Sequence, residues 1–153
     1  MIFELNGKNV DVEAKPTMTL LELLRGELGV MSVKKGCEQG ECGACTVLLD
    51  GSPVTSCLVL APQVEGRRVL TIEGLADNPL MKELRDAFLE NGAVQCGYCT
   101  PGMLLSAYAL LKDNRHPTEE EVRVGIEGNI CRCTGYVTII EAILDAAVRI
   151  APE

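Results

Sequence analysis

Residues 36–45 read GCEQGECGAC and place Cys37, Cys42 and Cys45 in a C-x4-C-x2-C pattern. This spacing is typical of a 2Fe–2S loop, in which a tight turn directs three thiolates toward one centre. Glycines at positions 36, 40 and 43 permit a positive φ and let backbone N–H groups approach the sulfurs. The segment therefore predicts an iron–sulfur loop and a fold that presents it.

A fourth thiol is expected from the hairpin that follows this loop. Asp50-Gly51 is a two-residue turn signal, and it sets Cys45 opposite Ser56. Cys57, one residue further on, then returns beside the third cysteine. A zinc ribbon or unrelated free thiols are the alternatives. Zinc sites usually repeat a short C-x2-4-C knuckle, which this set lacks.

A second set of four cysteines follows residues 58–95, which contain none. Its spacing is C-x2-C, a long interval, and then C-x-C, and its members are Cys96, Cys99, Cys131 and Cys133. Four thiolates in this arrangement suit a second 2Fe–2S cluster, but they could also hold Zn²⁺ tetrahedrally. A Rieske centre is excluded because it needs two histidine ligands and the chain has only His116.

Each cysteine pair of the second set is followed by threonine, glycine and the apolar pattern of a helix. Thr100 and Thr134 are therefore predicted N-caps, and Pro101 suits the first helical position. Two helix N-termini near one site favour an anionic group, because helix N-termini carry partial positive charge.

The chain divides into two predicted domains, residues 1–75 and 76–153. Residues 1–75 combine strand and turn signals around one short helix, which indicates an α+β unit. Its predicted elements are strands Ile2–Leu5 and 10–13 around an Asn6-Gly7 turn, a helix over 19–28, strands Thr46–Leu49 and 54–57, and a strand over 69–72.

Residues 76–153 have helical periodicity and indicate a small four-helix bundle. The predicted helices are Pro79–Glu90, 101–112, one that begins at Thr118, and Val137–Ile150. Thr118 and Glu121 form the pattern of a capping box.

Composition narrows the class of partner. The formal charge is −8, which argues against nucleic acid or an anionic membrane surface. No segment approaches the ~20 apolar residues of a membrane span, and the N-terminus has no secretion signal. We therefore expect a cytoplasmic protein, in which eight cysteines bind metal or serve redox chemistry more often than they form disulfides.

Three motifs together resemble the small iron–sulfur subunit of the molybdenum hydroxylases, the family of xanthine dehydrogenase and aldehyde oxidoreductase. They are GCEQGECGACTV at 36–47, QCGYCTPGM at 95–103 and GNICRCTGY at 128–136. The resemblance covers nearly the whole chain. It implies a β-grasp, plant-type ferredoxin domain followed by a four-helix bundle, with one 2Fe–2S cluster in each.

The resemblance also implies partners. Similar subunits form a hetero-oligomer with a large subunit that carries molybdopterin, often as its cytosine dinucleotide, and commonly with an FAD-binding subunit. Gln95 and Cys133 would lie beside the pterin. Electrons would pass to the helical-domain cluster, then the ferredoxin-domain cluster, then FAD or an outside acceptor. The family's catalytic base belongs to the large subunit, so no catalytic residue is expected here.

Two other functions are open from the sequence. A free-standing electron carrier would suit the acidic charge, although a shuttle needs only one cluster. A metal-stabilised interaction module without redox chemistry would hold zinc instead of iron. Tyr98 and Tyr136 are predicted to pack over the second site, and Arg132 either offsets the charge of a cluster or faces solvent.

Overall fold

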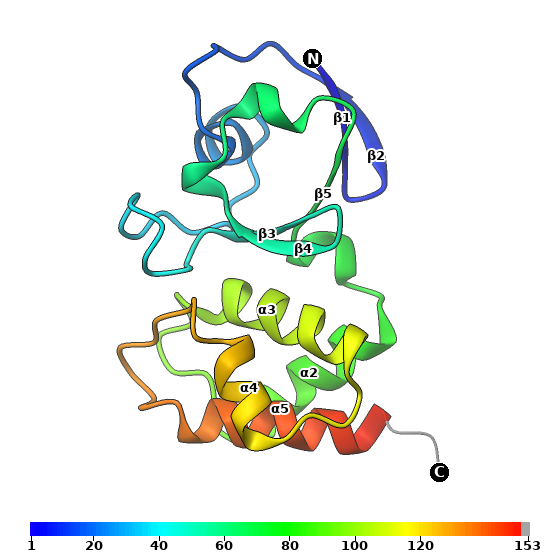
Figure 1. The fold of residues 1–153 in the computed structure, drawn as a ribbon, viewed down its shortest axis with the longest axis vertical. Coiled ribbons are helices and arrows are strands. Elements are labelled where there is room, and N and C mark those ends of the chain that lie inside the picture. The colour runs from blue at the N-terminus through cyan, green and yellow to red at the C-terminus, as the bar shows by residue number, and fades with distance from the viewer. Residues whose placement is uncertain (151–153) are drawn as a thin grey trace.

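The computed structural model describes residues 1–150, which form a mixed sheet followed by helices (Figure 1). The predicted α+β class is confirmed. The strands are β1 (Ile2–Leu5), β2 (Lys8–Asp11), β3 (Thr46–Leu49), β4 (Ser52–Thr55) and β5 (Arg68–Leu70), in the order β2-β1-β5-β3-β4. Only β1 and β5 pair in parallel, and the other neighbours are antiparallel.

Two tight turns set the register of the hairpins. Asn6 and Gly7 have φ values of +52° and +79°, and Asp50 and Gly51 have +50° and +92°. Positive φ at both central residues is the geometry of a two-residue hairpin turn. Pairing therefore starts directly beside each turn, so β2 begins two residues before the predicted strand 10–13.

The predicted helix over 19–28 is split into two parts. Thr19 caps α1 (Leu20–Glu22), which continues as a π-helical turn, η1 (Leu23–Glu27). The Leu28 N–H bonds the carbonyl of Leu23 at 3.1 Å, which is the wider i→i+5 spacing of that turn. The leucines of both parts are buried in a core that they share with side chains of β1, β3 and β5.

Short 3₁₀ turns end two strands earlier than predicted. Two of these turns, η2 (Ser56–Leu58) and η4 (Ile72–Leu75), follow the strands, and a third, η3 (Ala61–Val64), lies between η2 and β5. The predicted strand 54–57 therefore stops at Thr55, and the predicted strand 69–72 stops at Leu70. One result matters for the site, since Cys57 lies on η2 rather than on a strand.

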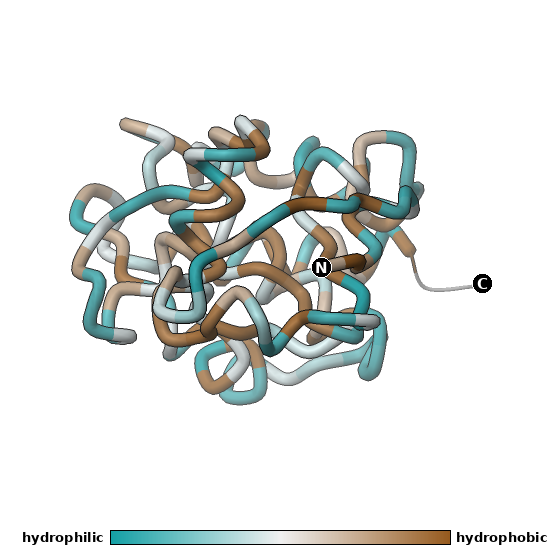
Figure 2. Tube along the Cα trace, turned by 90° about the horizontal axis from the view of Figure 1, so that it is seen from above, coloured by the Kyte–Doolittle hydropathy of each residue, from teal (hydrophilic) through white to brown (hydrophobic). Residues whose placement is uncertain are grey.

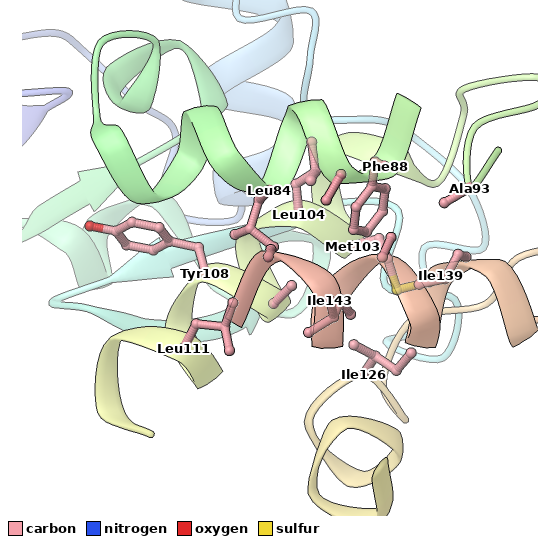
Figure 3. Close-up of a cluster of buried hydrophobic side chains, with 14 of the residues drawn as sticks. Leu84, Phe88, Ala93, Met103, Leu104, Tyr108, Leu111, Ile126, Ile139 and Ile143 are labelled. Atoms are coloured by element: carbon pink, nitrogen blue, oxygen red, sulfur yellow. The ribbon is translucent and has the colours of Figure 1, made fainter. Parts of the chain in front are cut away.

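The four predicted helices are present. They are α2 (Pro79–Glu90), α3 (Thr100–Asp113), α4 (Glu119–Gly125) and α5 (Val137–Ile150). Thr118 and Glu121 make the predicted capping box of α4. Figure 3 shows the core between these helices, where Phe88, Met103 and Ile139 are fully buried. None of the helices within residues 1–150 is long and apolar enough to cross a bilayer.

Strand β3 joins the sheet half, β1 to β5, to the helical half, α2 to α5. All four residues of β3 are buried. Leu48 packs into the helical core, whereas Val47 and Leu49 pack into the sheet core, as the alternation of side chains along a strand requires. Helix α3 lies across β3 and β4 (Figure 1). Viewed from above, hydrophobic segments run largely through the interior and hydrophilic ones along much of the rim (Figure 2).

Candidate metal centres

The first cysteine loop is a tight excursion between η1 and β3. Gly40 and Gly43 have φ values of +80° and +67°, as expected, but the other positive φ in the loop, +57°, belongs to Glu38 rather than Gly36. Gly36 is needed for space instead. A Cβ there would lie 2.6 Å from the sulfur of Cys42, so only glycine leaves room for that thiol.

Backbone N–H groups of this loop converge on one sulfur. Gln39 N, Glu41 N and Cys42 N donate to Cys37 Sγ at 3.3, 3.4 and 3.4 Å. These bonds lower the pKa of Cys37 to about 6. Thiolates are the form that binds iron, and N–H groups stabilise an anionic sulfur. The loop therefore fits a thiolate-bound, negatively charged cluster.

The hairpin brings the third and fourth cysteines together as predicted. Thr46 pairs with Thr55, and the next residue, Ser56, donates through its N–H and its hydroxyl to the Cys45 carbonyl at 3.3 and 2.8 Å. Cys57 follows on η2. Burial and then the neighbouring Cys45 raise the pKa of Cys57 to about 11. Both thiols are buried, so this side of the set is closed to water.

The second set comes from two loops. One loop joins α2 to α3 and carries Cys96 and Cys99, and the other joins α4 to α5 and carries Cys131 and Cys133. Cys99 lies within hydrogen-bonding reach of Cys131, and burial followed by that contact raises the pKa of Cys99 to about 12. Cys133 has the same relation to Cys96. All four of these cysteines line one cavity of about 160 Å³, and Cys42 of the first set lines it too.

The predicted threonine caps are wrong at both helices. Helix α3 begins at Thr100 itself, with Cys99 in the cap position and no side-chain bond. Thr134 lies before α5, and its hydroxyl donates to Cys131 Sγ at 3.1 Å. Burial opposes ionisation of Cys131, but the bonds from Thr134 outweigh it and lower the pKa of Cys131. Thr134 thus stabilises a thiolate directly instead of capping a helix.

The residues around the second set divide by exposure. Gln95, Arg132 and Tyr98 line the cavity from the exposed side, and Cys96 and Cys133 are also exposed. Tyr98 donates through its hydroxyl to the Lys35 carbonyl at 2.6 Å, so it joins this loop to the sheet half. Tyr136 does not line the cavity, and its hydroxyl accepts a bond from Cys131 N.

Sequence reasoning missed the residues that join the two cysteine loops. Ile130 N–H donates to the Cys42 carbonyl at 2.9 Å, and the buried Asn129 contacts the same loop. Both belong to the motif at 128–136, but nothing in their spacing marked them as contacts. The loops that carry cysteines therefore gather on one side of the molecule, at the left in Figure 1.

Two family models match adjoining segments that together span residues 3–144. A 2Fe-2S iron-sulfur cluster binding domain matches residues 3–71, and a 2Fe-2S binding domain matches residues 71–144. The nicotinate dehydrogenase small FeS subunit of Eubacterium barkeri is 51% identical over 147 residues, which are 96% of this chain and 94% of that one. The chain belongs to the family of small iron–sulfur subunits of molybdenum hydroxylases.

Two further relatives match this chain over most of its length. The xanthine dehydrogenase iron-sulfur-binding subunit of Escherichia coli O157:H7 is 47% identical, over 92% of this chain and 89% of that one. In the crystal structure of quinoline 2-oxidoreductase from Pseudomonas putida 86, one chain superposes with a TM-score of 0.91 at 47% identity, covering 97% of this chain and 91% of that one.

A third comparison shows the same fold inside a longer chain. The aldehyde oxidoreductase of Desulfovibrio desulfuricans superposes with a TM-score of 0.90 at 41% identity, and the match covers 97% of this small iron–sulfur subunit but 17% of that chain. The subunit thus carries two 2Fe–2S-binding domains and has an electron-transfer role within an oxidoreductase. A free-standing carrier is not favoured, because the relatives are subunits of such enzymes.

Proposed function

We propose that the two cysteine sets are the ligands of two 2Fe–2S clusters. The first set is Cys37, Cys42, Cys45 and Cys57, and the second is Cys96, Cys99, Cys131 and Cys133. The observation that carries the proposal is the convergence of three N–H donors on Cys37 Sγ, together with a cavity that is lined by all four cysteines of the second set. Iron–sulfur clusters of this type take four cysteine thiolates each.

The two clusters would belong to two domains, residues 1–75 and 76–153. Separate hydrophobic cores support this division, one that includes side chains of β1, β3 and β5 and one between the helices. Leu75 of η4 is buried in the helical core, so the short turn before α2 fastens the sheet half to the helical half.

A large molybdopterin-binding subunit is the proposed partner, with the pterin as its cytosine dinucleotide, and an FAD-binding subunit completes the hetero-oligomer. Gln95 and Cys133 would contact the pterin. Both residues are exposed and line the same cavity, which supports a contact with a group held by another chain. We place this assembly in the cytoplasm.

Electrons would enter at the second cysteine set and leave through the first. Cys96 and Cys133 are exposed, whereas Cys131 is buried and follows Ile130, which bonds the Cys42 carbonyl. The second set therefore lies between an open surface and the first set. Bond chemistry would take place at molybdenum in the large subunit, with no catalytic residue in this chain.

Metal analysis of anaerobically purified protein tests the ligand sets. We expect about four iron and about four sulfide ions per chain, two of each per cluster, and two distinct EPR signals after reduction. Cys37→Ser should remove one signal and Cys131→Ser the other. Zinc at the second set, or one substitution that abolishes neither signal, would contradict the proposal.

Co-purification tests the partners. The chain is expected to elute with a molybdenum-containing subunit from its native source. Elution as a lone chain with both clusters intact would instead support a free-standing carrier.

A further inference from the structure

Asn129 is a buried polar residue that contacts three segments of the chain. Only 5% of its surface is exposed. Its amide nitrogen donates to the Gly43 carbonyl at 3.1 Å and to the Thr46 hydroxyl at 3.3 Å, and its amide oxygen accepts from Ser106 Oγ at 2.6 Å. The amide nitrogen thus bonds only the sheet half, and the amide oxygen bonds α3 of the helical half.

The residue after Asn129 makes the most direct link between the two cysteine sets. Ile130 N–H donates to the carbonyl of Cys42 at 2.9 Å. Ile130 immediately precedes Cys131. One hydrogen bond and one intervening residue therefore separate a cysteine of the first set from a cysteine of the second.

The segments around this link approach so closely that no space is left for a Cβ at two of their glycines. A Cβ on Gly43 would lie 2.2 Å from the Gly128 carbonyl oxygen and 2.7 Å from the Asn129 amide nitrogen. A Cβ on Gly102, in the first turn of α3, would lie 2.5 Å from the Gly43 carbonyl oxygen. Close approach of this kind fixes distance, because packed interiors do not deform continuously.

A buried amide is a costly way to fill space. Burial of a polar group costs free energy unless it is hydrogen-bonded, and an apolar side chain here would leave the buried Ser106 hydroxyl without its acceptor. The amide contributes directional contacts, because each hydrogen bond requires a narrow range of distance and angle between its two groups. Tyr98, whose hydroxyl bonds the Lys35 carbonyl, adds a second tie between the cavity loop and the sheet half.

We infer that Asn129 is a positioning residue that fixes the separation of the two cysteine sets. The inference rests on the proposed function, because the separation matters only if each set holds a cluster. With a cluster held by each set, the transfer would move one electron from the cluster of the second set to that of the first set, with no bond or proton changed.

Asn129→Asp tests the inference with a side chain of the same shape. The carboxylate still accepts from Ser106 but can no longer donate to the Gly43 carbonyl or to the Thr46 hydroxyl. Asn9→Asp, on the exposed edge strand β2, makes the same chemical change away from both cysteine sets. Thr46→Val removes the hydroxyl that accepts from the same amide and that also donates to the Gly43 carbonyl at 2.7 Å.

The measurement is the dipolar splitting of the EPR signals of the two reduced clusters, which depends on the distance between them. We expect Asn129→Asp to broaden or narrow the splitting, Thr46→Val to change it in the same direction by less, and Asn9→Asp to leave it unchanged, all at full iron content. If Asn129→Asp does not yield folded protein, Thr46→Val decides alone.

Two kinds of failure are distinguishable. Full iron and sulfide with the parent splitting in Asn129→Asp and Thr46→Val would overturn the positioning role and leave the proposed function intact. Less than the full iron complement in the unmodified chain, or zinc in place of iron, would overturn the proposed function before any splitting is compared.

Discussion

Gly43 must be glycine for two separate reasons, its backbone conformation and the close approach of another segment. Its φ of +67° is costly for any residue with a Cβ, and a Cβ there would also overlap the Gly128 carbonyl. Gly66 has nearly the same backbone, with a φ of +69°, but has no atom within 4 Å of its would-be Cβ. Comparing substitutions at Gly43 and Gly66 therefore separates the cost of backbone strain from the cost of steric overlap.

Gly43→Ala should destabilise the protein more than Gly66→Ala does. The left-handed backbone costs roughly 1–2 kcal/mol in both, and the overlap adds about 1–3 kcal/mol at position 43. Denaturant unfolding of the iron-loaded variants measures the difference. Equal losses in the two variants would show that the contact between the cysteine loops relaxes without cost.

At the scale of the element, β3 and α4 show how single side chains place whole segments. Strand β3 is buried on both faces and gives Leu48 to the helical core and Leu49 to the sheet core. Helix α4 is only seven residues long and is held at its start by Thr118 and Glu121. Its stability therefore depends on its cap more than that of a longer helix would.

Leu48→Ala and Leu49→Ala remove the same volume from opposite faces of one strand. Each should cost about 2–5 kcal/mol. Hydrogen exchange should show the difference: Leu48→Ala loosens α3 and the helical core, whereas Leu49→Ala loosens β1, β5 and the segment around η1. The same exchange pattern in both variants would mean that the two cores unfold as one.

Thr118→Ala should destabilise the helical half by about 1 kcal/mol. The Thr118 hydroxyl accepts from Glu121 N at 3.2 Å, and without it that N–H loses its partner. Thermal unfolding against the parent chain gives the size of the effect. Thr118→Ser, which keeps a hydroxyl acceptor, is the matched control and should retain most of the stability.

The elements were largely predictable from the sequence, and the contacts between halves were not. Two-residue turns and caps act locally, so Asp50-Gly51 predicted the β3–β4 register and Thr118 predicted the start of α4. The cap predicted at Thr134 was wrong, because its hydroxyl bonds the nearby Cys131 sulfur and α5 begins only at Val137. The role of Asn129 could not be predicted from the sequence, because its partner Gly43 lies 86 residues away.

At the scale of the whole molecule, large apolar and aromatic side chains are exposed beside the second cysteine set, in a chain of net charge −8. Ile130 is 53% exposed and Tyr98 is 49% exposed, and both line the cavity that holds Cys96 and Cys133. Apolar side chains at this position suit burial against another subunit. The proposed partner would therefore dock over the opening of the second site.

Ile130→Glu should weaken binding of the large subunit by about tenfold or more, which is about 1.4 kcal/mol, because a charge would be buried at the contact. Val148→Glu, at a 76% exposed position on α5, is the control and should leave binding unchanged. Co-purification and titration of the recombined subunits measure both. Both variants should keep their iron, because the Ile130 bond to Cys42 uses the backbone.

The bonds from Asn129 and Ile130 also determine when, during synthesis of the chain, the first cysteine loop can complete its contacts. The loop at 36–45 receives its contacts from residues that the ribosome adds much later, since the Asn129–Gly43 bond spans 86 positions. The sheet half emerges first and can form its hairpins. Its cysteine loop lacks its contacts with Asn129 and Ile130 until residues 128–136 have left the ribosomal exit tunnel. Insertion of the first cluster during translation would therefore meet an open, more accessible pocket, and completion of the chain would close it.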